Sequence, residues 1–339
     1  MSELVDRLVA SITKAYGKGS AMFLGSLPDS DTSDWVSSGS AAIDNAIGRP
    51  GFPCGKLSSI NGYPGAGKTT IVTHVLAECQ KRGGVAMLLD TEYSFDPERA
   101  ARIGVDSDKL ILCQPPCMEE AFGIIDISLD ELIKEDRLGV IAWDTVSVTL
   151  TKAQIELPRD AQATQAVATQ ARCVSFHLGK IVRKLAKSRC ALIFVNQLKQ
   201  NVGVTWGSGD AYIAERPIGY HSHVILRIHK KSNLQKSGEV YGITSGIRVV
   251  KNKVAPPFKK CEVDIVFTDG IDDSRSLIEA GVSAGLIRAL GGGWYELHLE
   301  GQEGFRMRRS ELLEWLKNDE AKEEIRKGVR EYVEDPSRT

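Results

Sequence analysis

The sequence of 339 residues lacks long apolar runs and has no excess of charge of either sign. No stretch reaches the roughly 18 consecutive apolar residues needed to span a bilayer, and the first residues lack the apolar segment of a secretion signal. We therefore expect a cytoplasmic protein that does not contact membranes. Lysine and arginine number 43 against 44 acidic residues, so binding to a polyanion would depend on local basic loops.

Cysteines are few, and their spacing excludes a common kind of metal site. The seven cysteines are scattered along the chain. Cys113 and Cys117 form the only close pair, and no second pair of Cys or His lies at the spacing of a zinc site. We interpret the cysteines as reduced thiols, most of them buried. Internal repeats and low-complexity segments are also absent.

Apolar runs that alternate with helical patterns indicate an α/β fold. With 42% apolar residues, the chain can bury one large core and a smaller one. Four strands are expected, over residues 57–61, 85–90, 140–144 and 192–196. Helices are expected over 118–133 and 166–187. This order of elements predicts a mostly parallel sheet that helices cover.

The rest of the chain predicts an N-terminal arm, an antiparallel end of the sheet and a small second domain. Residues 3–16 place apolar side chains on one helical stripe before the break at 17–19. Strands over 224–228, 247–251 and 263–267 follow one another without long helices between them. After Gly270 we expect short helices around the turn at 291–293 and a charged helix near 310–333. The expected divisions are 1–34, 35–270 and 271–339.

The segment Gly62-Tyr63-Pro64-Gly65-Ala66-Gly67-Lys68-Thr69 matches the phosphate-binding loop in full. It follows an expected strand and opens a helix, which is the context that the pattern requires. The glycines let backbone N–H groups surround phosphates, Lys68 reaches the outer phosphates, and Thr69 can ligate Mg²⁺. A glycine-rich turn with an unrelated lysine is the alternative.

Polar side chains end three of the expected strands. Asp144 ends an apolar strand, where a carboxylate holds the water shell of Mg²⁺; otherwise such a residue caps a helix. Glu92 follows a neighbouring strand and is either a general base for attack of water on the γ-phosphate or a solvated loop acid. Gln197 is delivered to the same edge, where an amide can sense a phosphate. These spacings predict an ATPase whose mechanical output is unassigned.

Nearly the whole chain resembles the RecA recombinase family, which includes bacterial RecA and its phage relatives. The resemblance runs through the phosphate loop and through residues 14–20, 39–40, 90–92, 96–97, 191–197 and 294–295. Phosphate loops are shared by many ATPases. The segment Val-Val-Lys-Asn-Lys-Val-Ala-Pro-Pro-Phe at 249–258 is the most specific feature.

The resemblance implies a RecA-type phosphate-loop ATPase core with a mostly parallel central sheet, an N-terminal oligomerisation arm and a small α+β C-terminal domain. It implies an ATP-dependent homologous recombinase that forms helical filaments on single-stranded DNA. Such a protein would catalyse pairing and strand exchange with homologous duplex DNA, and its cofactors would be ATP and Mg²⁺. A single-strand-binding protein and loading mediators would be further partners.

Family roles can be transferred residue by residue. Glu92 corresponds to the base, and Gln197 to the switch between the γ-phosphate and the DNA-binding loops. Lys251 and Lys253 would act in trans on the neighbour's ATP; a solvated edge strand is the alternative. The residues expected to bind ATP are Gly62, Pro64, Gly65, Ala66, Gly67, Lys68, Thr69, Thr70, Asp96 and Arg99, and those expected at the subunit interface are Tyr16 and Tyr220.

Two segments resemble the DNA-binding loops, one over about 155–165 that runs into Arg172, and one over 199–219. Val202, Thr205 and Trp206 would form an apolar wedge between bases, although Trp206 is alternatively a core anchor. The residues expected to contact phosphates are Arg159, Arg172, Lys199 and Arg216.

The chain departs from the family pattern at several positions. Ala214-Glu215 replaces paired glycines, Gly179 replaces an arginine and Gly219 replaces a lysine, so other residues must supply some DNA and interface contacts. Arg99 stands where relatives stack a tyrosine on adenine, and its planar guanidinium can stack as well. A long acidic C-terminal tail is absent, so we expect no autoinhibitory brake on duplex binding.

Two other functions share the same core. A hexameric helicase-like ring motor would use the phosphate loop, Asp144 and a trans-acting basic residue, but it leaves the N-terminal arm and the C-terminal domain unexplained. A recombination mediator or nucleotide-binding regulator is the second alternative. Mediators usually carry a zinc ribbon of paired cysteines, which this sequence lacks.

Overall fold

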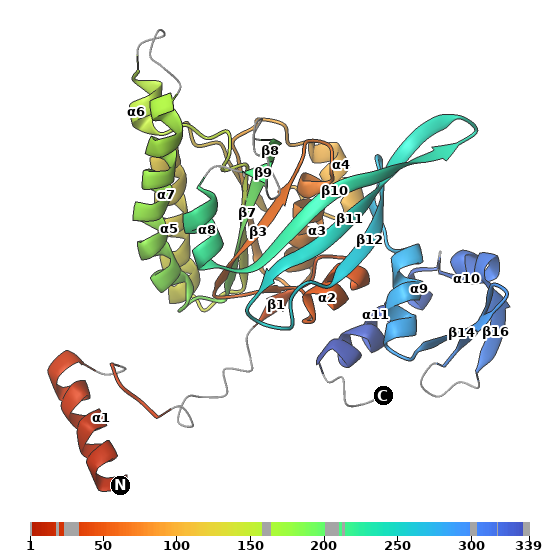
Figure 1. Cartoon of the computed structure of the whole chain (residues 1–339), viewed down its shortest axis with the longest axis horizontal. Coiled ribbons are helices and arrows are strands. Elements are labelled where there is room, and N and C mark those ends of the chain that lie inside the picture. Colours follow the sequence, from red (N-terminus) through yellow and green to blue (C-terminus); the bar gives the residue numbers. More distant parts are fainter. Residues whose placement is uncertain are drawn as a thin grey trace. The chain divides into compact units, whose positions relative to one another are not determined.

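The computed structural model describes residues 2–17, 20–23, 34–157, 164–200, 210–211, 214–298, 304–316 and 318–334. The chain divides into two compact units, Met1–Ser33 and Asp34–Thr339. The first unit contains helix α1 (Ser2–Tyr16), which is labelled in Figure 1. Apolar side chains of this helix are exposed, including Leu4, Leu8 and Ile12. Among the described residues, no helix is long and apolar enough to cross a membrane.

The second unit is built on a sheet that has nine strands in the described part of the chain, in the order β13-β12-β11-β10-β3-β7-β6-β4-β5. Neighbouring strands from β10 to β5 run parallel, and β11, β12 and β13 continue antiparallel. The expected mostly parallel sheet with an antiparallel end is therefore confirmed. The strands are β3 (Lys56–Gly62), β4 (Val85–Asp90), β5 (Leu110–Cys113), β6 (Gly139–Asp144), β7 (Cys190–Gln197), β10 (Ser222–Lys236), β11 (Glu239–Asn252), β12 (Lys260–Val266) and β13 (Gly270–Asp272).

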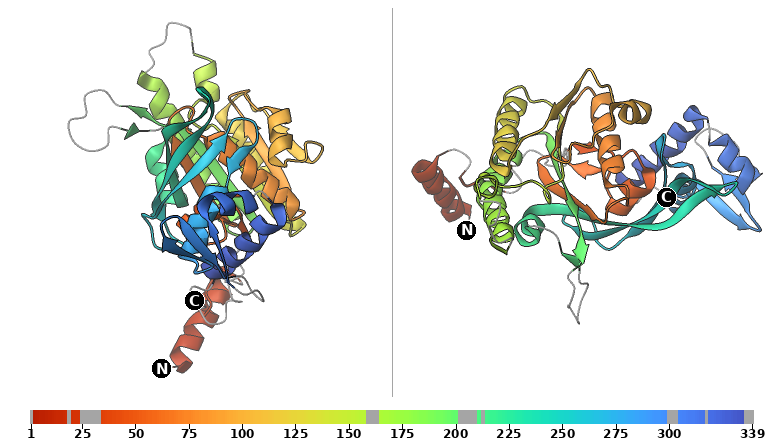
Figure 2. Two further views of the ribbon diagram at one scale, coloured as in Figure 1. Left: turned by 90° about the vertical axis from the view of Figure 1, so that its right-hand side faces the viewer. Right: turned by 90° about the horizontal axis from the view of Figure 1, so that it is seen from above.

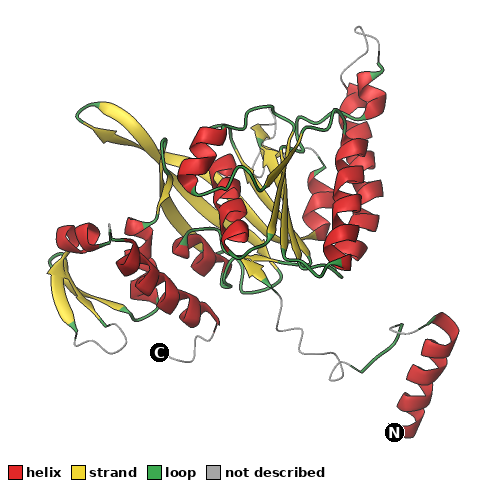
Figure 3. Cartoon of the chain, turned by 180° about the vertical axis from the view of Figure 1, so that it is seen from behind, coloured by secondary structure: helices red, strands yellow, loops and turns green. Residues whose placement is uncertain are grey.

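Helices cover both faces of this sheet (Figures 1 and 3). One face packs against α2 (Ala41–Ile47), α3 (Lys68–Lys81) and α4 (Pro97–Ile103). The other packs against α5 (Met118–Lys134), α7 (Thr164–Leu185) and α8 (Glu215–His221). Successive residues of each central strand point to opposite faces, so an unbroken apolar run supplies both cores. Short elements complete this unit: β1 (Trp35–Val36), β2 (Phe52–Pro53), α6 (Lys152–Ile155), β8 (Lys199–Gln200) and β9 (Asp210–Ala211).

The C-terminal region corrects one expectation. Instead of short helices around residues 291–293, a three-stranded antiparallel sheet surrounds this turn. All three glycines have positive φ, between 60° and 86°, which makes the segment a hairpin turn. The charged segment near 310–333 forms two helices and not one. The elements are α9 (Ser274–Ser283), β14 (Ile287–Gly291), β15 (Trp294–Leu297), β16 (Phe305–Arg308), α10 (Arg309–Trp315) and α11 (Asp319–Glu334).

A buried carboxylate joins this region to the core. Asp273 accepts hydrogen bonds from Ser40 Oγ at 2.6 Å and from the backbone N of Ala41 at 3.0 Å. Ala41 opens α2, so the carboxylate satisfies a free N–H at a helix N-terminus. This contact fixes the start of α2 to the loop before α9.

The hairpin of β10 and β11 is longer than the sequence predicts (Figure 2). Only residues 222–228 of β10 pair with β3, and the remainder pairs with β11 alone. Most side chains of the distal part are exposed. Exposed strands need no alternation of apolar and polar residues, which explains why the expected strand at 224–228 stopped short. The expected strand at 247–251 also stopped short, although residues 242–246 of β11 are buried.

Candidate functional site

The phosphate loop lies between β3 and α3, as the sequence predicts. Gly65 and Gly67 have φ values of 70° and 96°, a conformation that glycine adopts without strain. Helix α3 begins at Lys68 without a side-chain cap, so its first N–H groups are available to an anion. Lys68 Nζ donates to the carbonyl of Tyr63 at 3.0 Å. Burial lowers the pKa of Lys68, while Asp144 and Glu92 oppose that shift.

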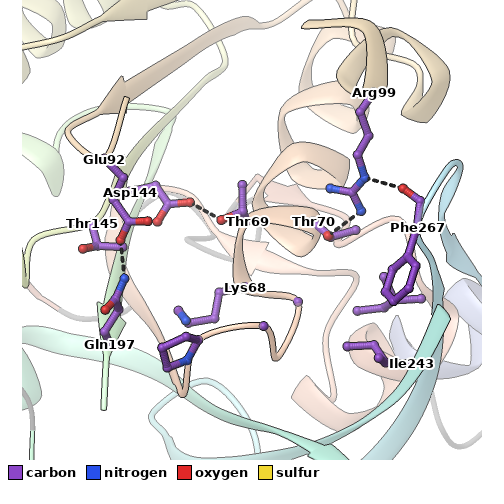
Figure 4. A pocket seen from close by; sticks show the side chains of 14 residues that line it. Lys68, Thr69, Thr70, Glu92, Arg99, Asp144, Thr145, Gln197, Ile243 and Phe267 are labelled. Atoms are coloured by element: carbon purple, nitrogen blue, oxygen red, sulfur yellow. Dashed lines mark hydrogen bonds between the residues drawn. The ribbon is translucent and has the colours of Figure 1, made fainter. Parts of the chain in front are cut away.

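Four parallel strands deliver their carboxyl ends to this loop. Asp90 pairs with Asp144 across β4 and β6, and Gly62 pairs with Gln197 across β3 and β7. The strand ends border a cleft of about 350 Å³ (Figure 4). Its lining residues are Pro64, Gly65, Gly67, Lys68, Thr69, Thr70, Glu92, Arg99, Asp144, Thr145, Gln197, Ile243, Ile265 and Phe267.

Asp144 and Thr69 form one wall of the cleft (Figure 4). Thr69 Oγ1 donates to Asp144 Oδ2 at 2.6 Å, and the buried Asp144 Oδ1 has no hydrogen-bond partner. Burial is the main reason that the pKa of Asp144 is raised to about 6. An unpartnered carboxylate oxygen beside a hydroxyl suits a hard cation. Within the described residues, no group of three or more His, Cys, Asp or Glu could hold a metal ion.

Glu92 and Gln197 face one another across the end of the cleft, and Gln197 Nε2 donates to Glu92 Oε1 (Figure 4). The loop that carries Glu92 is held by Asp90, whose carboxylate accepts from the backbone N of Ser94 at 3.3 Å and of Phe95 at 3.2 Å. Gln197 is held in turn, because its backbone N donates to Ser147 Oγ at 3.0 Å. The backbone segments that carry this carboxylate and this amide are therefore held by hydrogen bonds outside the cleft.

The opposite end of the cleft is apolar, apart from Arg99. Its guanidinium donates to the carbonyl of Phe267 at 2.8 Å and to Thr70 Oγ1 at 2.9 Å (Figure 4). Ile243, Ile265 and Phe267 complete this wall. Asp96 is not among the residues that line the cleft. Its carboxylate caps α4 by accepting from the backbone N of Glu98 and Arg99 at 3.0 and 3.1 Å.

Ser245 on β11 contacts the phosphate loop from behind, and the sequence did not point to it. Its buried hydroxyl donates to the carbonyl of Ala66 at 2.8 Å. In a trans peptide the carbonyl of Ala66 and the N–H of Gly67 point in opposite directions. Ser245 thereby orients the N–H of Gly67 away from itself. A Cβ at Gly67 would lie 2.3 Å from Ile265 Cδ1, so this side of the loop is closely packed.

Lys251 and Lys253 lie away from their own chain's cleft, which neither of them lines. Lys253 follows the last residue of β11, Asn252, and so lies just beyond that strand. Both ammonium groups nevertheless meet, because each donates to the carbonyl of Tyr220 at 3.3 Å. Tyr220 itself is 74% exposed. Burial and the neighbouring Lys253 lower the pKa of Lys251.

The expected DNA-binding residues are described in part. Arg172 on α7 and Arg216 on α8 are exposed. Lys199 lies in β8, whereas Arg159, Val202, Thr205 and Trp206 lie outside the described residues. The end of the expected second loop, from Glu215 to Gly219, is helical and belongs to α8.

Ala214, where the family pattern has glycine, precedes α8 with φ of 54°. This is the left-handed conformation that glycine adopts without strain. Ala214 therefore has the backbone conformation that glycine would adopt at this position, but its Cβ adds some strain.

Comparison with known proteins gives the same assignment along almost the whole chain. The sequence model of the RecA N-terminal domain matches residues 3–272. The chain is 37% identical to protein RecA of Symbiobacterium thermophilum over 86% of this chain and 81% of that protein. It is 35% identical to protein RecA of Chlorobaculum parvum over 96% of this chain and 90% of that protein. It is 35% identical to protein RecA of Halalkalibacterium halodurans over 97% of this chain and 91% of that protein. The chain therefore belongs to the RecA family of DNA-dependent ATPases and homologous recombinases.

Proposed function

We propose that this recombinase binds ATP with Mg²⁺ in the cleft behind the phosphate loop and polymerises on single-stranded DNA to exchange it with a homologous duplex. One observation carries this proposal. A complete phosphate loop, a buried carboxylate with an unpartnered oxygen and the Glu92–Gln197 pair share one cleft. The ring motor and the mediator are not favoured, because relatives named RecA match most of the chain.

We assign a different role in phosphoryl transfer to each group of residues in the cleft. The backbone of residues 62–69 and the ammonium of Lys68 hold the phosphates, and Thr69 and Asp144 would hold Mg²⁺, which neutralises charge on the β- and γ-phosphate oxygens when bound. Glu92 accepts the proton of the attacking water. Thr70, Arg99 and the apolar wall accommodate the base and sugar, with Asp96 fixing the helix that carries Arg99.

Gln197 couples the cleft to DNA. It lies two residues before Lys199, where the second DNA-binding segment begins. When the γ-phosphate is present, its amide exchanges the bond to Glu92 for one to the phosphate, and this change shifts the segment that follows. Phosphates of the DNA contact Arg159, Arg172, Lys199 and Arg216, while Val202, Thr205 and Trp206 insert between bases.

The filament requires contacts between copies of the chain. The exposed stripe of α1 supports the role of residues 1–34 as an arm that packs on the adjacent protomer, with Tyr16 and Tyr220 at that joint. Residues 35–270 would form the ATPase core and 271–339 the C-terminal domain. A single-strand-binding protein and loading mediators are further candidate partners.

Electron microscopy with single-stranded DNA and a slowly hydrolysed ATP analogue tests the proposed function. We expect helical filaments whose length follows that of the DNA, together with exchange of a labelled strand into a homologous duplex. Lys68→Ala removes the phosphate-binding ammonium and should abolish ATP hydrolysis. Rings of fixed size, or filaments that never exchange strands, would contradict the proposal.

Loss of the Ser245 hydroxyl should weaken nucleotide binding. Ser245→Ala leaves the buried carbonyl of Ala66 without its donor, which destabilises this conformation of the loop by about 1–3 kcal/mol. We therefore expect KM for ATP to rise, by at most about 5- to 150-fold, with a smaller change in kcat. Ser58→Ala is the matched control, because Ser58 is a buried serine of β3 whose hydroxyl has no hydrogen-bond partner. Equal KM values for the two variants would show that Ser245 does not orient the loop.

A further inference from the structure

Tyr93, the residue after Glu92, has an unusual backbone conformation. Its φ is 56°, in the left-handed region, which residues other than glycine, asparagine and aspartate seldom adopt because the Cβ crowds a carbonyl oxygen. Tyr93 is 64% exposed, so packing of its ring is not the main cause. A strained conformation persists only where the surrounding structure imposes it. The cause must therefore lie in the residues on either side of Tyr93.

The residue before Glu92 is tied to the end of strand β6. The backbone N of Thr91 donates to the carbonyl of Asp144 at 3.0 Å, and Thr91 Oγ1 donates to the carbonyl of Thr145 at 2.9 Å. Thr149 Oγ1 in turn donates to Thr91 Oγ1 at 2.9 Å. These bonds fix the start of the loop to the strand that ends in Asp144.

The residues after Tyr93 are turned back toward strand β4. Ser94 and Phe95 donate their backbone N–H groups to the carboxylate of Asp90, which is 3% exposed and also accepts from Gln114 Nε2 at 3.4 Å. The ring of Phe95 packs against the core on the face of the sheet that α3 covers. Only Glu92 and Tyr93 therefore span the distance between two fixed points of the loop.

The φ of Tyr93 sets the direction of Glu92. This angle is the rotation about the N–Cα bond of Tyr93, so it turns the planar peptide between Glu92 and Tyr93 against the residues that follow. With both ends of the loop fixed, a change in φ must be taken up by Glu92, whose carboxylate faces Gln197 (Figure 4). Resting on the proposed role of Glu92 as the base, we propose that the left-handed backbone of Tyr93 directs this carboxylate into the cleft. Tyr93 is then a positioning residue.

The test ranks substitutions of Tyr93 by their preference for the left-handed backbone. Glycine and asparagine adopt it readily, whereas a β-branched residue is an outlier there. Tyr93→Gly and Tyr93→Asn should therefore hydrolyse ATP in a single turnover within a few-fold of the unaltered rate. Tyr93→Val should be slower by about 5- to 150-fold, the change in population that a disfavoured backbone region brings. Its Kd for a non-hydrolysed ATP analogue should change little, because the phosphate loop is intact.

Asp136→Val is the matched control for the strain itself. Asp136 also has a left-handed backbone, with φ of 45°, and it lies between α5 and β6 with its side chain 82% exposed. It does not line the cleft. This variant should lose stability as Tyr93→Val does, yet its single-turnover rate should equal that of the unaltered protein.

Combination with Glu92→Gln separates positioning from general damage to the cleft. If Tyr93 acts through Glu92, Tyr93→Val should hardly slow the Glu92→Gln protein further, because the base whose direction it disturbs is already gone. A general defect would slow both proteins by the same factor.

Three results would overturn the inference. The first is a Tyr93→Val protein as fast as Asp136→Val, and the second is an undiminished effect of Tyr93→Val in the Glu92→Gln protein. The third is a loss of hydrolysis in Tyr93→Asn, which decides against the inference whether or not Tyr93→Val folds. Normal hydrolysis by Glu92→Gln alone would instead contradict the proposed role of Glu92, so the two failures are distinguishable.

Discussion

Glu92→Gln is expected to bind ATP and DNA yet to hydrolyse ATP about 10²–10⁴-fold more slowly, because the amide cannot accept the proton of the attacking water. Glutamine is nearly isosteric with glutamate and can still accept a hydrogen bond from Gln197, so the cleft should keep its shape. Filaments on single-stranded DNA should therefore form normally and dissociate slowly. Single-turnover hydrolysis and filament lifetime measure the two effects.

The control for this variant is Glu98→Gln, which makes the same chemical change six residues further along. The Glu98 side chain is 91% exposed on α4 and does not line the cleft. Its turnover should equal that of the unaltered protein. If Glu92→Gln also hydrolyses ATP within a few-fold of the unaltered protein, the base lies elsewhere and Glu92 only holds Gln197.

The double variant Lys251→Ala/Lys253→Ala should lose DNA-stimulated hydrolysis while it still binds ATP through its own Lys68. Trans-acting cations that stabilise transferred phosphoryl groups are worth about 10³–10⁵ in kcat. Two ammonium groups gathered at one carbonyl, outside their own cleft, are suited to reach the nucleotide of a neighbour. Lys134→Ala/Lys327→Ala is a matched control, since both lysines are exposed and form ion pairs with surface acids.

Mixing two inactive proteins isolates the trans action. When Lys68→Ala is mixed with the double lysine variant, some joints combine an intact phosphate loop with intact lysines of the neighbour. Partial recovery of hydrolysis, dependent on the mixing ratio, is the expected result once mixed filaments are seen. Mixed filaments without recovery at any ratio, or full turnover by the double variant alone, would assign Lys251 and Lys253 to a solvated edge.

The sequence predicted those residues of the site that directly follow or end a recognisable apolar strand. Central parallel strands are buried on both faces, so they appear as apolar runs, and the polar residues that end them lie at one edge of the sheet. Asp144 and Gln197 could be found in this way. Ser245 and Phe267 could not, because one lies in antiparallel strand β11 and the other directly follows antiparallel strand β12, and the place of these strands beside the phosphate loop depends on the order of the sheet.

The sequence failed to predict strands in regions where the pattern of apolar and polar residues is weak. The distal part of β10, residues 229–236, is mostly exposed and pairs with β11 alone, so it needs no apolar side chains to form. The strands β14 to β16 were missed because glycines at 291–293 were interpreted as a break between helices, whereas their positive φ values make a hairpin. The roles of Trp206 and Arg159 stay predictions.

Strand β11 contacts two nucleotide sites at once if its Lys251 acts in trans. Ser245 lies behind the strand's own phosphate loop, and Lys251, six residues later and about 20 Å away, lies outside that cleft. Along the strand, the residue beside the protomer's own ATP, Ser245, comes first, and the residue that would reach the neighbour's ATP, Lys251, comes later. A change in one site could then be passed to only one of its two neighbours. ATP hydrolysis would then proceed along the filament in one direction, starting from the same end each time.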